Sequence, residues 1–202
     1  MGRARDIANV LSSSTNIALD SELGLSLITP TSIAVTGGSG SISSTGGVSF
    51  TGSSVISLNG CFTSTYDNYK IIFTTTIIGN IFMRLRASGS DETTAQHVYV
   101  VQGLDQGNTA DNASSGGAGT VFHIAKSASS LQSSISLDLY SPKLSAVTSY
   151  TGISMNRTGA ATMSNWDISG LLNTTTSYDG ISIYSQSGNA MTGNIKVYGY
   201  RN

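Results

Sequence analysis

The sequence has little charge, almost no cysteine and no long apolar run. Charged residues make up 10% of the 202 residues and the formal net charge is −1, so no long-range field would attract nucleic acid or an anionic membrane. A single cysteine, Cys61, excludes an intrachain disulfide framework and leaves no cysteine cluster for zinc. No apolar segment approaches the roughly 20 residues of a membrane span. We therefore expect no nucleic-acid partner, no membrane insertion and no metal or other cofactor.

Serine, threonine, glycine and asparagine occupy the positions that charged residues usually fill. This composition is poor in helix formers and rich in residues typical of strands and tight turns. Strand signals recur from Cys61 onward at intervals of roughly ten to twenty residues, as in a sandwich or barrel. We predict an all-β fold, an antiparallel β-sandwich of the jelly-roll kind. After the central stretch described next, strands are expected at 97–102, 121–126, 135–140, 150–156, 163–168, 180–184 and 194–200.

The central stretch, residues 66–88, contains two apolar segments that alternate with polar residues. They lie at 69–73 and 81–85, on either side of Gly79 and Asn80. Alternation with a period of two is typical of a half-buried strand. We therefore predict a hairpin with its turn at Gly79, in the core of the sandwich.

Arg84 and Arg86 are the main charges within this stretch. Their parity is opposite to that of Met83 and Leu85, so both guanidinium groups should project away from the core. Two interpretations stay open. The arginines are solvated sheet residues, or they form an intersubunit contact with carbonyl or carboxylate acceptors.

The N-terminal segment, residues 1–28, differs from the rest of the chain. Apolar residues fall at Ile7, Val10 and Leu11, the i, i+3, i+4 spacing of one helical face. A helix this short is marginal alone, so we expect the segment to dock onto another surface. A frayed tail is the alternative.

Residues 29–60 are rich in Gly, Ser and Thr, with brief β-prone islands between the glycines. The pattern predicts a shaft of short strands or, if the glycine content dominates, a flexible linker. Islands of three residues bury too little surface to be stable alone, so partner chains would have to cover them. We therefore divide the chain into an N-terminal segment (1–28), a shaft or linker (29–60) and a β-sandwich domain (61–202).

Two polar stretches are candidate contact loops. The first, residues 103–120, includes Asn108 and Asn112 and lacks strand signals, and loops of that length are usually functional or disordered. The second, residues 172–180, ends in an Asp-Gly turn signal. We expect Tyr178 to present an aromatic face there.

No pattern of residues indicates catalysis. His97 and His123 each lie in a strand-like run, and no Gly-x-Ser-x-Gly elbow precedes a helix. Most of the acidic residues fall at turns, where Asp ordinarily bonds to its own backbone. We expect that the protein is not an enzyme.

Three segments together resemble one group of proteins. They are residues 2–13, reading Gly-Arg-Ala-Arg-Asp-Ile-Ala-Asn-Val-Leu-Ser-Ser, residues 68–71 with 83–89, and residues 191–200. The combination resembles structural proteins of tailed bacteriophages, in which a similar opening precedes a β-rich tail-fibre or capsid-surface domain. The resemblance implies a homotrimeric virion surface component, assembled in the host cytoplasm. Its N-terminal segment would attach to other virion proteins and its sandwich would be displayed outward.

Within this group, the resemblance favours a tail-fibre or adaptor-type protein that aids host attachment. A head decoration or cement protein is the alternative. An unrelated class, a carbohydrate-binding module or depolymerase, would require stacked exposed aromatics or converging acids, and Trp166 is expected in the core. A host cell-surface glycan is a candidate receptor. The residues predicted for anchoring are Arg3, Arg5, Ile7, Val10 and Leu11, and those predicted for receptor contact are Asn108, Asn112 and Tyr178.

Overall fold

The computed structural model describes residues 24–107, 110–157 and 162–201. Every regular element in these ranges is a β-strand, which confirms the all-β prediction, and no helix there is long and apolar enough to cross a membrane. The predicted anchor residues Arg3, Arg5, Ile7, Val10 and Leu11, and the predicted contact residue Asn108, lie outside the described residues. The strands are β1 (Leu25–Ile28), β2 (Ser32–Thr36), β3 (Ser39–Ile42), β4 (Val48–Ser53), β5 (Val55–Asn59), β6 (Asn68–Ala87), β7 (Ser90–Asp91), β8 (His97–Asp105), β9 (Ala110–Gly119), β10 (Phe122–Tyr140), β11 (Thr148–Arg157), β12 (Met163–Leu172), β13 (Gly180–Ser185) and β14 (Met191–Tyr200).

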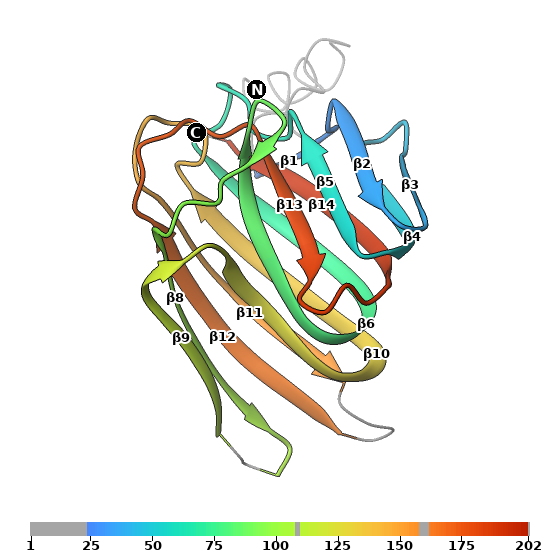
Figure 1. Cartoon of the computed structure of the whole chain (residues 1–202). Coiled ribbons are helices and arrows are strands. Elements are labelled where there is room, and N and C mark those ends of the chain that lie inside the picture. Colours follow the sequence, from blue (N-terminus) through green and yellow to red (C-terminus); the bar gives the residue numbers. More distant parts are fainter. Residues whose placement is uncertain (1–23, 108–109, 158–161, 202) are drawn as a thin grey trace, which may run out of the picture.

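One continuous hydrogen-bonded sheet folds over on itself to give two layers (Figure 1). The sheet bends along β6, where one edge of the strand pairs first with β14 and then with β13. Residues 69–76 pair with β14, whereas residues 81–86 pair with β13. The other edge of β6 pairs with β10 along both halves. β6 and β10 therefore belong to both layers.

The larger layer contains β3, β4, β14, the first half of β6, the second half of β10, β11, β12, β8 and β9, with β1 also paired to β14. The smaller layer contains β2, β5, β13, the second half of β6 and the first half of β10. All these pairings are antiparallel. The predicted antiparallel β-sandwich is confirmed.

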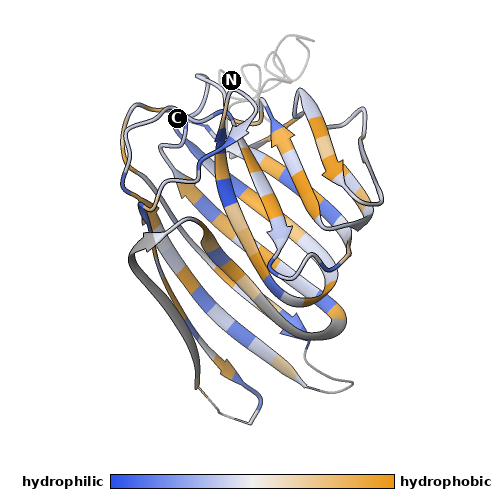
Figure 2. Ribbon diagram, viewed as in Figure 1, coloured by the Kyte–Doolittle hydropathy of each residue, from blue (hydrophilic) through white to orange (hydrophobic). Residues whose placement is uncertain are grey.

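The core lies between the two layers and is built from alternate residues of the strands. Figure 2 shows apolar and polar residues alternating along the central strands. Aromatic side chains pack between the layers. The ring centroid of Phe122, in the smaller layer, lies 4.6 Å from that of His97 and 4.7 Å from that of Tyr150, both in the larger layer. Trp166 is buried, as predicted, and so is Cys61. The alternation leaves every second residue of the larger layer facing outward.

The predicted hairpin at Gly79 is wrong, because residues 68–87 form a single 20-residue strand, β6. Gly79 has a φ of 106°, which glycine adopts without a side-chain clash, so the chain bends between the layers without reversing. β10 follows the bend through a register shift between Ser127 and Leu131. Odd-numbered residues are buried on both sides of Gly79, and this unbroken parity is the pattern of a continuous strand.

Residues 29–60 form neither a separate shaft nor a linker. β4 pairs with β14 and β5 pairs with β13, both from the C-terminal part of the chain. Phe50 and Leu58 lie in the same core cluster as Phe73 and Ile183. The short strands are stable because β13 and β14 cover the surface that we expected partner chains to cover.

The predicted contact loop at 103–120 is largely a strand. Residues 110–119 form β9, which pairs with β8 from Leu104 opposite Ala110 to His97 opposite Gly119. The β9 sequence, Ala-Asp-Asn-Ala-Ser-Ser-Gly-Gly-Ala-Gly, has no β-branched or aromatic residue. Intrinsic propensity therefore gave no strand signal there, and the pairing with β8 determines the structure.

Candidate binding surfaces

The outer face of the larger layer carries side chains from six neighbouring strands in register. One row across this face runs Lys196, Ile72, Ser136, Ile153, Asp167 and Gln102. Residues directly opposite each other on paired strands share a face, and so do residues two positions along a strand. Two groups on this face have distinct chemistry. We call them the apolar patch and the tyrosine platform.

The apolar patch occupies β8, β11 and β12. It consists of Val100, Leu104, Ile153, Met155 and Met163, which are between 44% and 52% exposed. Polar side chains lie among them, because Asn165 stands between Met155 and Leu104 in register. Asp167 stands in the same way between Ile153 and Gln102. Exposed aliphatic side chains gathered on one sheet face are typical of a contact surface.

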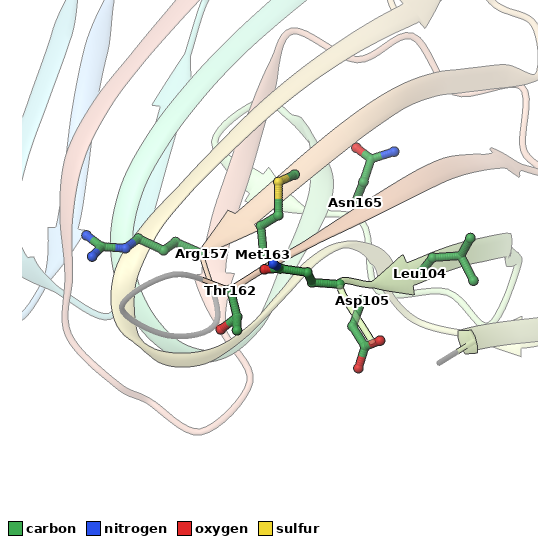
Figure 3. Close-up of a pocket in the computed structure, with 7 residues that line it drawn as sticks. Leu104, Asp105, Arg157, Thr162, Met163 and Asn165 are labelled. Atoms are coloured by element: carbon green, nitrogen blue, oxygen red, sulfur yellow. The ribbon is translucent and has the colours of Figure 1, made fainter. Parts of the chain in front are cut away.

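An open depression of about 660 Å³ lies at the end of the patch. Leu104, Met163 and Asn165 line it, and Met163 and Asn165 project from the same side of β12 (Figure 3). Arg157 and Asp105 also line it. Aliphatic walls with an amide and a few charges suit the side chains of another protein.

The tyrosine platform occupies β14, β6 and β10. It consists of Tyr140, Tyr200, Lys70 and Asp138. Lys70 Nζ lies 3.0 Å from Asp138 Oδ1, and the Tyr200 hydroxyl donates to the same oxygen. The Tyr140 hydroxyl lies 3.4 Å from Thr151 Oγ1 on β11. The platform therefore combines two aromatic rings with one ion pair.

The charges of the platform compensate each other. Burial alone would lower the pKa of Lys70, but the hydrogen bond and charge of Asp138 outweigh burial and raise this pKa. Burial, and then the hydrogen bond to Asp138, raise the pKa of Tyr200. At neutral pH the ammonium and the phenol are thus protonated, and the opposite formal charges of the Lys70–Asp138 ion pair cancel.

Arg86 lies on the outer face of the smaller layer, opposite in parity to buried Leu85, as predicted. Its side chain is 11% exposed and bonds to the Asp91 carboxylate. It also donates to Ser182 Oγ at 2.8 Å and to Asn59 Oδ1 at 3.0 Å. We call this set of contacts the Arg86 network, and it ties β5, β13, β6 and β7 together.

Arg84 shares the outer face with Arg86. Its Nε donates to the Thr120 carbonyl oxygen at 3.0 Å, and its guanidinium carbon lies 5.0 Å from the centre of the Tyr184 ring. Both arginines thus have partners within the chain. An additional contact to a neighbouring subunit stays a prediction for both.

Tyr178 does not present an aromatic face, and that prediction is wrong. Its side chain is 0% exposed. The hydroxyl lies 2.7 Å from Thr174 Oγ1 and donates to Glu92 at 3.1 Å, while the backbone N–H donates to the Pro142 carbonyl oxygen at 2.7 Å. These bonds hold the loop against the sandwich. Asn112 lies in β9 opposite Gln102, and its contact with a receptor stays a prediction.

The two histidines lie in the core. His97 Nδ1 is 3.1 Å from the Thr94 carbonyl oxygen, and His123 Nε2 is 3.1 Å from the Ala125 carbonyl oxygen. Burial lowers the pKa of His97 and raises the pKa of Cys61 to about 12. Among residues 24–107, 110–157 and 162–201, no three His, Cys, Asp or Glu side chains are grouped so that they could hold a metal ion.

No protein-family model and no curated protein matches the sequence. Among solved structures, the chain is similar to a variant of a family 29 carbohydrate-binding module, at 9% identity and a TM-score of 0.33, covering 87% of this chain and 89% of that one. Basic winged bean lectin with Tn-antigen is 8% identical with a TM-score of 0.30, covering 90% and 99%. Peanut lectin with a 9mer peptide is 10% identical with a TM-score of 0.30, covering 88% and 98%.

Neither binding surface was predicted from the sequence. The alternation of β14 placed Tyr198 and Tyr200 on its outer face, but the pairing that brings Tyr200 to Asp138 joins residues 62 positions apart. In β11, Ile153 and Met155 alternate with the polar residues Ser154 and Asn156, a pattern that would place the two apolar side chains in the core, whereas the structure buries Ser154 and Asn156 instead. The alternation therefore did not show that these two are exposed.

Proposed function

We propose that the protein is a non-catalytic structural component of a tailed-phage virion, of the tail-fibre or adaptor type, and that its copies assemble through the apolar patch. The observation that carries the proposal is the patch itself. Single exposed apolar residues are normal, but several gathered on one sheet face mark a protein contact. The resemblance of residues 2–13, 68–71, 83–89 and 191–200 to tailed-phage structural proteins supplies the setting.

A further copy of the same chain is the partner that fits the patch best. The chain carries a net charge of −1, so identical copies repel each other little. Asp167 places a carboxylate among the aliphatic side chains of the patch, and Gln102 and Asn165 supply amide donors and acceptors. An interface of this kind combines apolar contacts with hydrogen bonds at its margin. Three copies around an axis, each presenting its patch to a neighbour, would form the homotrimer.

The test is the mass of the full chain in solution, measured by light scattering over a range of concentrations. We expect three times the 20.9 kDa chain mass. Ile153→Thr combined with Met155→Thr should lower the mass to that of one chain, because both side chains lie in the patch. Ile78→Thr is the matched control, since Ile78 is as exposed as Ile153, at 51%, and lies on β6 outside the patch.

Two results would contradict the proposal. A single-chain mass for the unaltered protein at every concentration would exclude assembly of copies. A trimer that persists in the double variant would show that another surface holds the copies together. Circular dichroism of each variant confirms that the sandwich is folded.

A further inference from the structure

We infer that the tyrosine platform is a binding site for neutral sugar residues of a cell-surface glycan. This inference rests on the proposed role in host attachment and names the ligand class. It concerns Tyr140, Tyr200, Lys70 and Asp138, at the opposite end of the sheet face from Met163. The site is a shallow surface that suits the exposed end or side of a glycan chain.

The Tyr200 ring lies flat across the sheet. Tyr200 is on β14 and its hydrogen-bond acceptor Asp138 is on β10, with β6 between the two strands. Neighbouring strands are about 4.8 Å apart, so β14 and β10 are separated by about 10 Å. A side chain standing upright on β14 would not reach Asp138. The ring must therefore lean over β6, and one of its faces points to solvent.

The Tyr140 ring leans in the same direction across this face, from β10 toward β11. Tyr140 is directly opposite Ser149 on β11, whereas its hydroxyl lies near Thr151, two residues further along that strand. The side chain is 39% exposed. Because both phenol hydroxyls are engaged within the protein, the rings are held in place before any ligand arrives. Such fixed rings lose little conformational entropy on binding.

The ion pair between the rings supplies directional contacts. Asp138 Oδ1 accepts from both Lys70 and Tyr200. Within the described residues, Oδ2 of the same carboxylate has no hydrogen-bond partner, and the Lys70 and Asp138 side chains are 24% and 28% exposed. Sugar hydroxyls can donate to Oδ2 and accept from the Lys70 ammonium. Hydrogen bonds to charged groups are stronger than those between neutral groups.

A neutral pyranose has the chemistry that matches these groups. Its C–H face is apolar and packs on a tyrosine ring, while its edge carries hydroxyl groups for hydrogen bonds. The platform has no net charge, so it gives no advantage to a sialylated or sulfated sugar. The affinity of one copy for a sugar should be low, because the site is open. The three sites of a homotrimer would raise the overall affinity for a glycan-coated surface through multivalency.

The experiment uses the full chain on an array of neutral hexose oligosaccharides together with sialylated and sulfated ones. We expect binding to neutral glycans. Tyr140→Ala, Tyr200→Ala and Asp138→Asn should each weaken it at least tenfold, as measured by titration calorimetry with the best-bound oligosaccharide. Asp138→Asn keeps the shape of the side chain and removes the charge, so it remains informative if an alanine variant unfolds.

The double variant of Ile153 and Met155 separates this inference from the assembly proposal. In titration calorimetry with the same soluble oligosaccharide it should bind as the unaltered chain does, because the patch lies outside the platform and multivalency does not affect the affinity of each site for a soluble monovalent ligand. Absence of binding to every neutral glycan, or equal binding by the Asp138→Asn variant, would overturn the sugar site. A trimer that binds no glycan would refute the sugar site alone, and a monomer that binds glycan would refute assembly alone.

Discussion

Removal of Asp91 from the Arg86 network should destabilise the sandwich strongly. Asp91 is the carboxylate partner of Arg86, whose side chain is 11% exposed. Ser182 Oγ also donates to Asp91 Oδ1 at 2.7 Å and lies 2.7 Å from Ser57 Oγ. Asp91→Ala would leave the guanidinium group nearly buried with no carboxylate beside it.

The expected loss follows from the burial of the pair. Removing one partner of a fully buried ion pair costs about 3–5 kcal/mol. The Asp91 side chain is 24% exposed, so water screens part of the charge, and Arg86 keeps its hydrogen bonds to Ser182 and Asn59. We therefore expect a decrease of about 2–3 kcal/mol in the free energy of unfolding. For a chain of this size, that decrease corresponds to a Tm lower by about 4–12 °C.

Urea unfolding followed by the fluorescence of Trp166, the single tryptophan, measures this loss. Asp67→Ala is the control, because Asp67 forms no ion pair within the described residues, and it should change the free energy by less than about 0.5 kcal/mol. Arg86→Met combined with Asp91→Ala should be less destabilised than the sum of the two single variants. Equal effects of Asp91→Ala and Asp67→Ala would refute the reasoning. A lower mass in solution with unchanged unfolding would instead place Arg86 in a subunit contact.

Two further predictions concern the core. Because burial lowers the pKa of His97 below its ordinary value of 6.5, the unfolded chain binds this proton at a higher pH than the folded chain. The stabilisation by neutral His97 is present above pH 6.5 and is lost as the pH falls toward the lower folded pKa, so His97→Gln should lose less stability than the unaltered chain between pH 7 and pH 5. Gly103→Ala would place a methyl group 2.0 Å from Trp166 Cδ1, so we expect a loss of about 1–3 kcal/mol and a red shift of the tryptophan emission. Gly47→Ala, where the nearest atom is 3.4 Å away, should leave both unchanged, and an unshifted emission for Gly103→Ala would contradict the contact.

The alternation of apolar and polar residues predicted most of the strands, because one face of the larger layer is exposed to solvent and the other is buried. Ile135, Leu137 and Leu139 alternate with polar residues, and the structure buries these three in β10. The same logic correctly placed Arg84 and Arg86 on the outer face of β6. Alternation is a local property, so it can be read from consecutive residues without knowledge of the pairing.

The pairing of the strands could not be predicted in the same way. Gly79 is a turn signal when read alone, but β10 and β13 pair with the residues that follow it and keep the strand continuous. β9 is rich in Ala, Ser and Gly, and is a strand because β8 pairs with it. The burial of Tyr178 also depends on residues that are distant in the sequence. Its hydroxyl donates to Glu92 and its backbone N–H donates to the Pro142 carbonyl oxygen, and these bonds hold the loop against the sandwich.

Strands β1, β4 and β5 pair with β13 and β14, which follow them in the sequence by more than 100 residues. This pairing determines when the sandwich can form during synthesis. The Ser57 and Ser182 side chains that meet across β5 and β13 are 125 residues apart, and Ser26 and Arg201 are 175 apart. β1, β4 and β5 therefore leave the ribosome long before β13 and β14 exist to pair with them. Non-local pairing is slow, and strands without partners are prone to aggregation. The sandwich can therefore close only after β13 and β14 have been synthesised.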